Sequence, residues 1–298
     1  MSILRAAVCV LATALAVAGS PVDPRIVVGP LDPEGLGAAS LRISGGRVAK
    51  VGQFPYQVAL FDSTGSFLGS GAIISTKTVL TAAQCIDGIL DDVVVRAGIL
   101  KLTDMNADGE RRTTLANRVI HPNFDAEFFD SDIAIINVPY DFTFPDTKKP
   151  AIGLIALPAY SEIGDGLANA AVTVSGWGKT SDSSDLTSTD LQYGQMNLAA
   201  DHKECAAEYG ASIIGTKLCT ASSQGASTCA GDVGGPVKRA VDDGFVRTEL
   251  IGIVSFGRPE SCTAGKPVVF TRVSAFYDFI ESNSDVKVPD LPVDDDDS

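Results

Sequence analysis

Basic residues and histidines are scarce in this chain of 298 residues. It has 23 Lys and Arg against 37 Asp and Glu, a formal net charge of −14, and two histidines. Surfaces that bind nucleic acids or anionic membranes are basic, so we expect neither partner. Charged residues make up 20% of the chain and apolar residues 45%, a balance that excludes wholesale disorder and allows a sizeable core in one or two domains.

Long hydrophobic runs are absent after the first twenty residues, which argues against a later transmembrane helix. The N-terminal run follows one basic residue, Arg5, and ends in Ala16-Val17-Ala18, the pattern of a secretory signal peptide cleaved after Ala18. A membrane anchor is the alternative, but about a dozen apolar residues are too few for ~30 Å of hydrocarbon. We therefore predict a signal peptide over 1–18 and a secreted, extracellular protein.

The composition changes twice along the rest of the chain. Residues 19–42 are rich in Gly and Pro without sustained periodicity, and we interpret them as a detachable pro-segment. From Ile43 onward short apolar runs alternate with turn residues, a spacing that predicts an all-β barrel or sandwich.

The C-terminal part departs from this β pattern. The stretch "SAFYDFIESN" has apolar residues at helical spacing after Ser274, a possible N-cap, and predicts an α-helix over about 274–283. Residues 286–298 form an acidic segment broken by prolines, which predicts a disordered tail, with a weak calcium or partner site as the alternative.

Eight separated stretches form an ordered series between Ile43 and about Ser282. They are "ISGGRVAKVGQFPYQVAL", "GAIISTKTVLTAAQC", "RVIHPNF", "SDIAIINV", "VSGWGKT", "STCAGDVGGPV", "IGIVSFG" and "PVVFTRVSAFYDFI". Together they resemble the chymotrypsin-like (trypsin-family) serine proteases, most closely the arthropod digestive branch. The resemblance implies an all-β fold of two six-stranded antiparallel β-barrels with a C-terminal α-helix. A trypsin-like domain would span 43–285, with barrels at about 43–155 and 156–273.

The catalytic triad of that family is altered at two of its three positions. The attacking serine of GDSGGP is replaced by Val233, and the histidine of TAAHC by Gln84, whereas Asp132 matches the orienting acid. An alkyl group cannot attack a carbonyl, and a carboxamide has no useful basicity near neutral pH. The resemblance therefore implies a protease homologue without catalysis, that is, no enzyme.

No other residue of the matching set replaces these groups. His121 matches a common surface position and His202 lies in a polar stretch. Ser255 matches a family serine that hydrogen-bonds the orienting acid, and it lacks a base, so we expect a structural role for it.

Three functions remain open for such a chain. The first is a pseudoprotease that binds or regulates proteases, inhibitors or substrates. The second is an enzyme of the serine endopeptidase family with very weak or unrecognised hydrolytic activity, and the third is a structural or storage protein with no specific partner. None of them calls for a cofactor or a metal.

The resemblance also assigns backbone and pocket residues around the triad. The N–H groups of Gly231 and Val233 would form the oxyanion hole, either as an inherited loop shape or as a dock for a carbonyl oxygen. Ser227 would lie at the base of the specificity pocket, between walls formed by Gly257 and Val268. Without an acidic base, and with a valine narrowing the slot, the preference would be for small or apolar residues.

Maturation by cleavage has two possible sites. Arg25 precedes "IVVG" and Arg42 precedes "ISGG", but only the second continues into the first family strand. We predict cleavage after Arg42 and an ion pair between the new ammonium of Ile43 and Asp232.

Five cysteines remain after removal of the signal peptide, so at least one thiol is left over. By resemblance, Cys205 pairs with Cys219 and Cys229 with Cys262. Cys85 lacks its family partner. A buried, inert thiol in a monomer is the expectation for Cys85, and a Cys85-linked dimer is the alternative.

One loop has part of a calcium-binding pattern. Asp104, Asn106 and Asp108 have the alternating spacing of an EF-hand, but Leu115 stands where the bidentate acid is required. We expect a solvated turn rather than a metal site.

Overall fold

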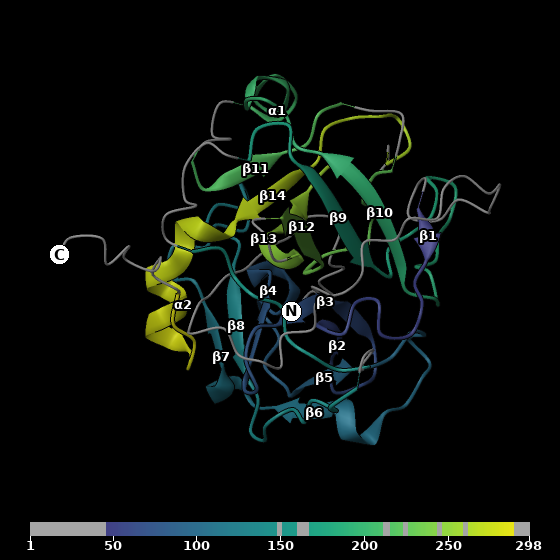
Figure 1. The fold of residues 1–298 in the computed structure, drawn as a ribbon, viewed down its shortest axis with the longest axis vertical. Helices are drawn as coiled ribbons and strands as arrows, with labels where there is room; N and C mark the ends of the chain where they lie inside the picture. The colour runs from purple at the N-terminus through teal and green to yellow at the C-terminus, as the bar shows by residue number, and fades with distance from the viewer. Residues whose placement is uncertain are drawn as a thin grey trace, which may run out of the picture.

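The computed structural model describes residues 46–147, 151–159, 167–210, 215–222, 226–242, 246–258 and 262–288. These residues form two antiparallel sheets, one above the other in Figure 1, and each contains seven strands. The segments predicted as a signal peptide and a pro-segment, and residues 289–298 of the predicted acidic tail, lie outside the described residues. The all-β fold with two barrel-like sheets is therefore confirmed.

The first sheet is built from the N-terminal half of the described chain. Its strands, in spatial order, are β6 (Glu110–Thr113), β5 (Val93–Ala97), β2 (Gln57–Phe61), β3 (Phe67–Ile73), β4 (Thr78–Thr81), β8 (Ala134–Asn137) and β7 (Arg118–Ile120). The edge strands β6 and β7 follow one another along the chain and are separated only by the 3₁₀ turn η3 (Leu115–Asn117). This interruption is why the sheet has seven strands where six were predicted.

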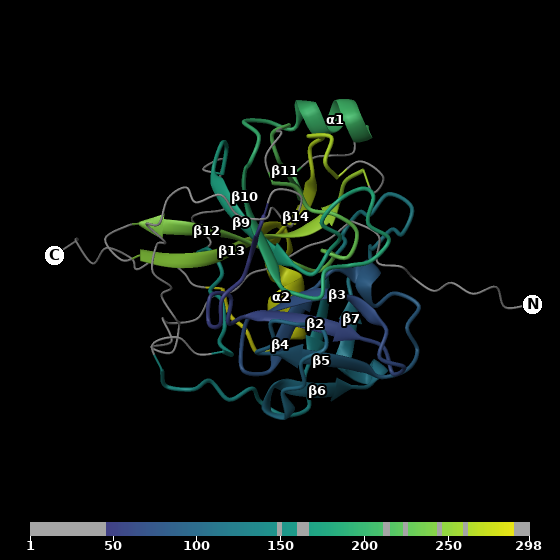
Figure 2. The same ribbon diagram turned by 90° about the vertical axis from the view of Figure 1, so that its right-hand side faces the viewer.

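The second sheet collects the C-terminal strands and one strand from the other half. Its order is β1 (Arg47–Val48), β10 (Gln192–Asn197), β9 (Ala171–Gly176), β12 (Pro236–Asp242), β13 (Val246–Phe256), β14 (Val269–Arg272) and β11 (Lys217–Cys219). The seventh strand is β1, which precedes the first sheet in the chain but pairs antiparallel with β10. Figure 2 shows β12 and β13 extending side by side as a long hairpin.

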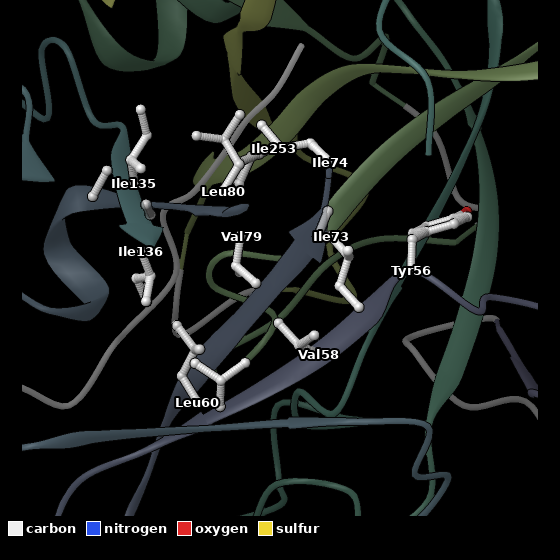
Figure 3. Packing of buried hydrophobic residues seen from close by; sticks show 14 of the residues in the cluster. Tyr56, Val58, Leu60, Ile73, Ile74, Val79, Leu80, Ile135, Ile136 and Ile253 are labelled. Atoms are coloured by element: carbon white, nitrogen blue, oxygen red, sulfur yellow. The ribbon is translucent and has the colours of Figure 1, made fainter. Parts of the chain in front are cut away.

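The larger core is built mainly on the first sheet and also takes in residues of the second half of the chain, such as Ile253 of β13, which Figure 3 shows beside Leu80 and Ile74. Strand β2 is buried along its whole length, and β8 supplies the buried isoleucines Ile135 and Ile136. β-Branched residues fit a pleated, buried surface, which explains why these short apolar runs form strands. Packing across the sheet by Val79 and Leu80 completes a close-packed interior.

Two short helices and their neighbours complete the fold. The predicted C-terminal helix is present as η5 (Val273–Phe276) followed by α2 (Tyr277–Asn283), beside β7 and β8 in Figure 1. The N-cap of α2 is Phe276 rather than Ser274, and it makes no side-chain cap bond, so that detail was wrong. Val286 and Val288, assigned to the tail, are buried in the larger core.

The second helix, α1 (Lys203–Tyr209), was not predicted. It is only seven residues long and buries one residue, Cys205, so it has almost no amphipathic pattern. Within the described residues, no helix combines the length and the apolar character needed to cross a bilayer.

Candidate active site

The three triad positions come from three separate elements. Gln84 lies in the 3₁₀ turn η1 (Ala83–Cys85) that follows β4, Asp132 lies just before β8, and Val233 lies in the turn before β12. Gln84 and Asp132 meet through two hydrogen bonds. The Gln84 backbone N–H donates to Asp132 Oδ1 at 3.0 Å and Gln84 Nε2 donates to Oδ2 at 2.7 Å. Gln84 is thus held by the orienting acid.

Asp132 is completely buried, with an exposed fraction of 0%. Its Oδ2 also accepts a hydrogen bond from Ser255 Oγ at 3.3 Å, and its backbone carbonyl accepts one from Thr271 Oγ1 at 3.1 Å. Burial raises the pKa of Asp132, while the hydrogen bonds from Gln84 and Ser255 and the charge of Lys217 oppose the rise. The predicted structural role of Ser255 agrees with this contact.

Val233 sits at the centre of a tight turn and is itself buried. Gly231 and Gly234 on either side have φ of +97° and +81°, a region that L-residues with side chains rarely adopt. The Val233 carbonyl accepts a hydrogen bond from the backbone N–H of Ser70 in β3, which ties the turn to the first sheet. A Cβ on Gly234 would overlap the Ser70 carbonyl oxygen, so this close approach requires glycine.

The turn keeps the two backbone donors assigned to the oxyanion hole. Within the described part of the chain, neither the Gly231 N–H nor the Val233 N–H donates a hydrogen bond. A buried, unpaired donor costs about 1–3 kcal/mol, so most native structures do not leave two side by side without a use. The resemblance assigns this donor pair to an oxyanion hole, and backbone donors do not depend on the side chain at position 233.

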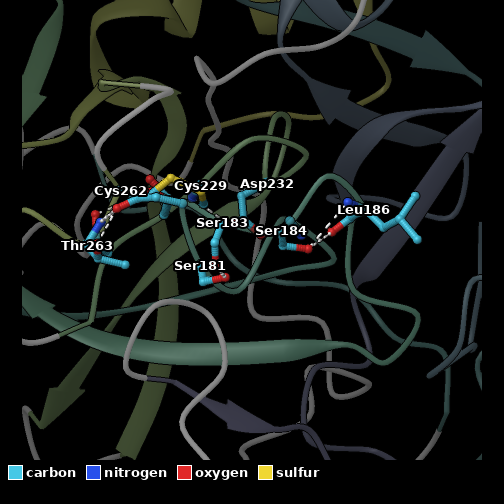
Figure 4. Close-up of a disulfide and its surroundings, with 12 residues drawn as sticks. Ser181, Ser183, Ser184, Leu186, Cys229, Asp232, Cys262 and Thr263 are labelled. Carbon is cyan, nitrogen blue, oxygen red and sulfur yellow. Dashed lines mark hydrogen bonds between the residues drawn. A yellow bond between two sulfur atoms is a disulfide. The ribbon is translucent and has the colours of Figure 1, made fainter.

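Asp232 is buried beneath the same turn. Its carboxylate accepts hydrogen bonds from the backbone N–H groups of Gly178 at 2.8 Å and Cys229 at 2.9 Å. A Cβ on Gly176 or Gly178 would collide with this carboxylate, so both glycines are needed to cradle it. Figure 4 shows Asp232 close to the disulfide between Cys229 and Cys262.

Burial raises the pKa of Asp232 to about 7, because the two backbone hydrogen bonds only partly offset the loss of water. A cation beside it would stabilise the ionised form. Ile43, the residue we expect to supply one, and Arg42 lie outside the described residues. The ion pair and the cleavage that would create it remain predictions.

Two of the three residues assigned to the specificity pocket line one cavity. Ser227 and Val268 face a space of about 390 Å³, whereas Gly257 is not among its lining residues. A Cβ on Gly257 would lie 3.7 Å from the Val268 side chain, an ordinary van der Waals contact, so these two residues are neighbours. Nearby, the hydroxyl of Thr228 is buried and has no hydrogen-bond partner among the described residues.

The cysteines are arranged as the resemblance implied. Disulfides join Cys205 to Cys219 and Cys229 to Cys262, and Cys85 is a free, buried thiol. The thiol of Cys85 is therefore shielded from a second chain in the folded protein.

Neither cluster of possible metal ligands has the geometry of a metal site. Asp104 accepts a backbone hydrogen bond from Lys101 at 2.8 Å, and Asn106 donates to the Ala97 carbonyl at 3.2 Å, as in an ordinary turn. Among the described residues, Asp182 also lies near the sulfur atoms of Cys229 and Cys262. Those sulfurs are joined in a disulfide, so no thiolate is available to a metal.

The two histidines lie away from the triad positions. The His121 ring packs against Phe276 and Phe279, with centroids 5.2 and 4.8 Å away, and burial lowers its pKa. His202 Nε2 hydrogen-bonds the backbone carbonyl of Lys217. Sequence reasoning missed Lys217 itself, whose side chain is buried beside the site. The only available signal was a lysine within the apolar strand "KLC".

The fold is that of a chymotrypsin-like protease. It has two antiparallel barrel-like sheets, the buried Asp132 at the triad position and a glycine-framed turn around Val233. The comparisons with known proteins agree. The family model described as Trypsin matches residues 43–280, and the chain belongs to this family.

Several named relatives match the chain over most of their own length. The chain is 33% identical to a collagenase of Hypoderma lineatum over 82% of this chain and 88% of that protein. It is 34% identical to brachyurin of Leptuca pugilator (82% and 99%) and 35% identical to trypsin-1 of Astacus astacus (81% and 100%). The solved structure titled HL collagenase matches with a TM-score of 0.67 at 32% identity, covering 81% of this chain and 98% of that one.

These comparisons correct the expectation that the chain is no enzyme. The relatives carry the names of enzymes, namely collagenase, brachyurin and trypsin, and they match over most of their length. That expectation rested on Gln84 and Val233 alone. The side chains at these two positions do not control the backbone donors of the oxyanion hole or the binding of a polypeptide, which contribute to catalysis separately.

Proposed function

We propose that the chain is an endopeptidase of the trypsin family whose hydrolysis is very weak and depends on the oxyanion hole and on substrate binding. The free N–H groups of Gly231 and Val233 carry this proposal. They stabilise negative charge that develops on a carbonyl oxygen when water attacks the carbonyl carbon. The attacking water releases a proton to solvent, the carbon–nitrogen bond breaks, and the amine leaves with a proton taken from solvent.

The expected rate follows from what the site retains. Losing the serine or the histidine of a triad costs roughly 10⁶ in turnover, because the two act as a unit. The oxyanion hole and binding alone leave about 10³–10⁴ over the reaction in water. Gln84 and Val233 supply neither a base nor a nucleophile, so the activity belongs in this lower range.

The same site also binds polypeptides without cutting them. When turnover is slow, a polypeptide docked in the hole dissociates uncleaved more often than it is hydrolysed, whether it comes from a substrate, a protease inhibitor or another protease. The valine side chain of Val268 and the uncharged Ser227, which both line the cavity, support a small apolar residue before the carbonyl. The signal-like N-terminus supports secretion of this protein, which N-terminal sequencing of secreted material tests, and the buried thiol of Cys85 supports a monomer.

The experiment measures hydrolysis of a peptide anilide with alanine before the scissile bond. It compares the native chain with Gln84→His, Val233→Ser and the double variant. We expect the native rate to exceed the uncatalysed rate by about 10³–10⁴-fold. The double variant should gain up to roughly 10⁶ more, and each single variant little, because base and nucleophile are needed together.

A fluorophosphonate separates real activity from contamination. This reagent reacts with an activated serine, which the native chain lacks at position 233, so native hydrolysis should persist in its presence. The double variant should be labelled and inhibited. Native hydrolysis that disappears with the reagent, or that never exceeds the rate in water, contradicts the proposal.

A further inference from the structure

Lys217 on β11 is the only lysine among the buried residues of the described chain, with an exposed fraction of 1%. A lysine is almost never fully buried unless it is paired. Its Nζ donates a hydrogen bond to the backbone carbonyl of Phe129 and lies 3.9 Å from Asp130 Oδ1. Both partners belong to the first barrel, so this side chain reaches across from the second barrel to the turn before Asp132.

The turn that Lys217 holds is conformationally strained. Phe129 and Ser131 have φ of 53° and 49°, a region that costs a residue with a side chain of order 1–3 kcal/mol. Such conformations persist only where the surroundings hold them. Asp132 is the next residue, so the path of this turn sets where the orienting carboxylate points.

An aromatic pair lies over the same contact. The rings of Phe129 and Phe256 have centroids 5.7 Å apart, and Lys217 Nζ lies 5.7 Å from the centre of the Phe256 ring. Phe256 follows Ser255, which hydrogen-bonds Asp132. Lys217 thus supports the turn and, through it, one side of the site.

The charges around Lys217 also support a role in holding this side of the site. The charged groups that face Lys217 are Asp130, half exposed, and Asp132, fully buried, while the His202 ring contacts its backbone carbonyl. Burial lowers the pKa of Lys217, and both carboxylates oppose this. A buried cation and a buried carboxylate in the same region each reduce the cost of the other.

We propose that Lys217 is a positioning residue, which holds the strained turn Phe129–Ser131 and compensates the buried charge of Asp132. This goes beyond the proposed function, because it concerns how the acid of the site is held and not what is hydrolysed. It also explains why a lysine occupies a buried position at the start of β11.

A double-mutant cycle on the native chain tests the coupling. The variants are Lys217→Met, Asp132→Asn and the pair, compared by urea unfolding at pH 8. We expect Lys217→Met to lower the folding equilibrium constant at least tenfold more in the native background than in the Asp132→Asn background, because the carboxylate is otherwise left uncompensated. Lys217→Arg should restore most of the loss.

Lys238 provides the matched control. It lies on β12 in the same barrel, over the Phe54 ring at 5.2 Å, and burial lowers its pKa too. Lys238→Met should change stability equally with either residue at position 132. An equal effect of Lys217→Met in the two backgrounds overturns the proposal, since a merely structural lysine would behave in that way.

A second readout uses the rebuilt site with Gln84→His and Val233→Ser. A nearby cation disfavours the protonated histidine, so adding Lys217→Met should move the rise of kcat/KM to higher pH, and Lys238→Met should not. An unmoved profile counts against the proposal. The stability cycle needs no hydrolysis, so failure of the rebuilt chain to cleave bears on the proposed function and leaves the test of Lys217 intact.

Discussion

Asp232→Asn in the uncut chain tests the electrostatics of the oxyanion turn. The native carboxylate is buried and held by two backbone N–H groups, and its pKa is about 7. The unfolded chain has an ordinary aspartate with a pKa of 3.8. Asparagine has nearly the same shape but cannot ionise, so the comparison isolates the charge. Arg42→Gln in both chains prevents cleavage at the predicted site.

The direction and the size of the pH effect on stability follow from the linkage between proton binding and folding. A carboxyl group whose pKa is raised on folding stabilises the folded state below the unfolded pKa, and this stability is lost as pH rises to the folded pKa. The window therefore runs from about pH 4 to about pH 7. The difference of about three pKa units corresponds to about 4 kcal/mol, since each unit is worth about 1.4 kcal/mol.

Urea unfolding at intervals between pH 4 and pH 8 measures the effect. We compare the free energy of unfolding of the chain with Asp232 with that of the Asp232→Asn variant. We expect the difference between the two to fall by about 4 kcal/mol as the pH rises across that range. Taking the difference between the two chains cancels titration of Asp132 and His121. Parallel pH profiles for the two chains would refute the reasoning.

A third arm repeats the comparison in chains that keep Arg42 and have been cut after it. If the ammonium of Ile43 pairs with Asp232, the pKa of that carboxyl falls and the loss of stability between pH 4 and 7 disappears in the cut chain only. A cut chain with the same profile as the uncut one would exclude the ion pair without affecting the first result.

Three further predictions follow from burial. On a non-reducing gel the protein should run as a monomer, because Cys85 is buried, and a reductant-sensitive dimer lost in Cys85→Ala would contradict this. Val268→Gly should open the slot and raise the relative binding of phenylalanyl over alanyl peptides by about tenfold or more, whereas an unchanged ratio would place the specificity elsewhere. Leu80→Ala, at a fully buried position, should lower the free energy of unfolding in urea by about 2–5 kcal/mol. The control Leu186→Ala, at an exposed position, should lower it by no more than about 0.5 kcal/mol. Equal losses would mean that the core is assigned wrongly.

Much of the fold could be predicted from the sequence, because strands and turns leave local patterns in it. Short apolar runs between turn residues predicted the strands, and the ordered series of motifs pointed to two barrels. Each sheet has seven strands where six were predicted. In the first sheet η3 separates β6 from β7, and in the second sheet β1 from the start of the described chain adds a strand beside β10. Helix α1 was missed because Cys205, its single buried residue, is held by a disulfide.

By itself, the sequence determined which chemical groups the site contains: a carboxamide at Gln84, a carboxylate at Asp132 and an alkyl group at Val233. Tertiary structure alone decided their relations. It brought Gln84 onto Asp132 across 48 residues and Lys217 onto Phe129 across 88. It also left the donors of the oxyanion turn free. Residue type is local information, whereas such contacts arise from the way two sheets pack together, which no short stretch of sequence encodes.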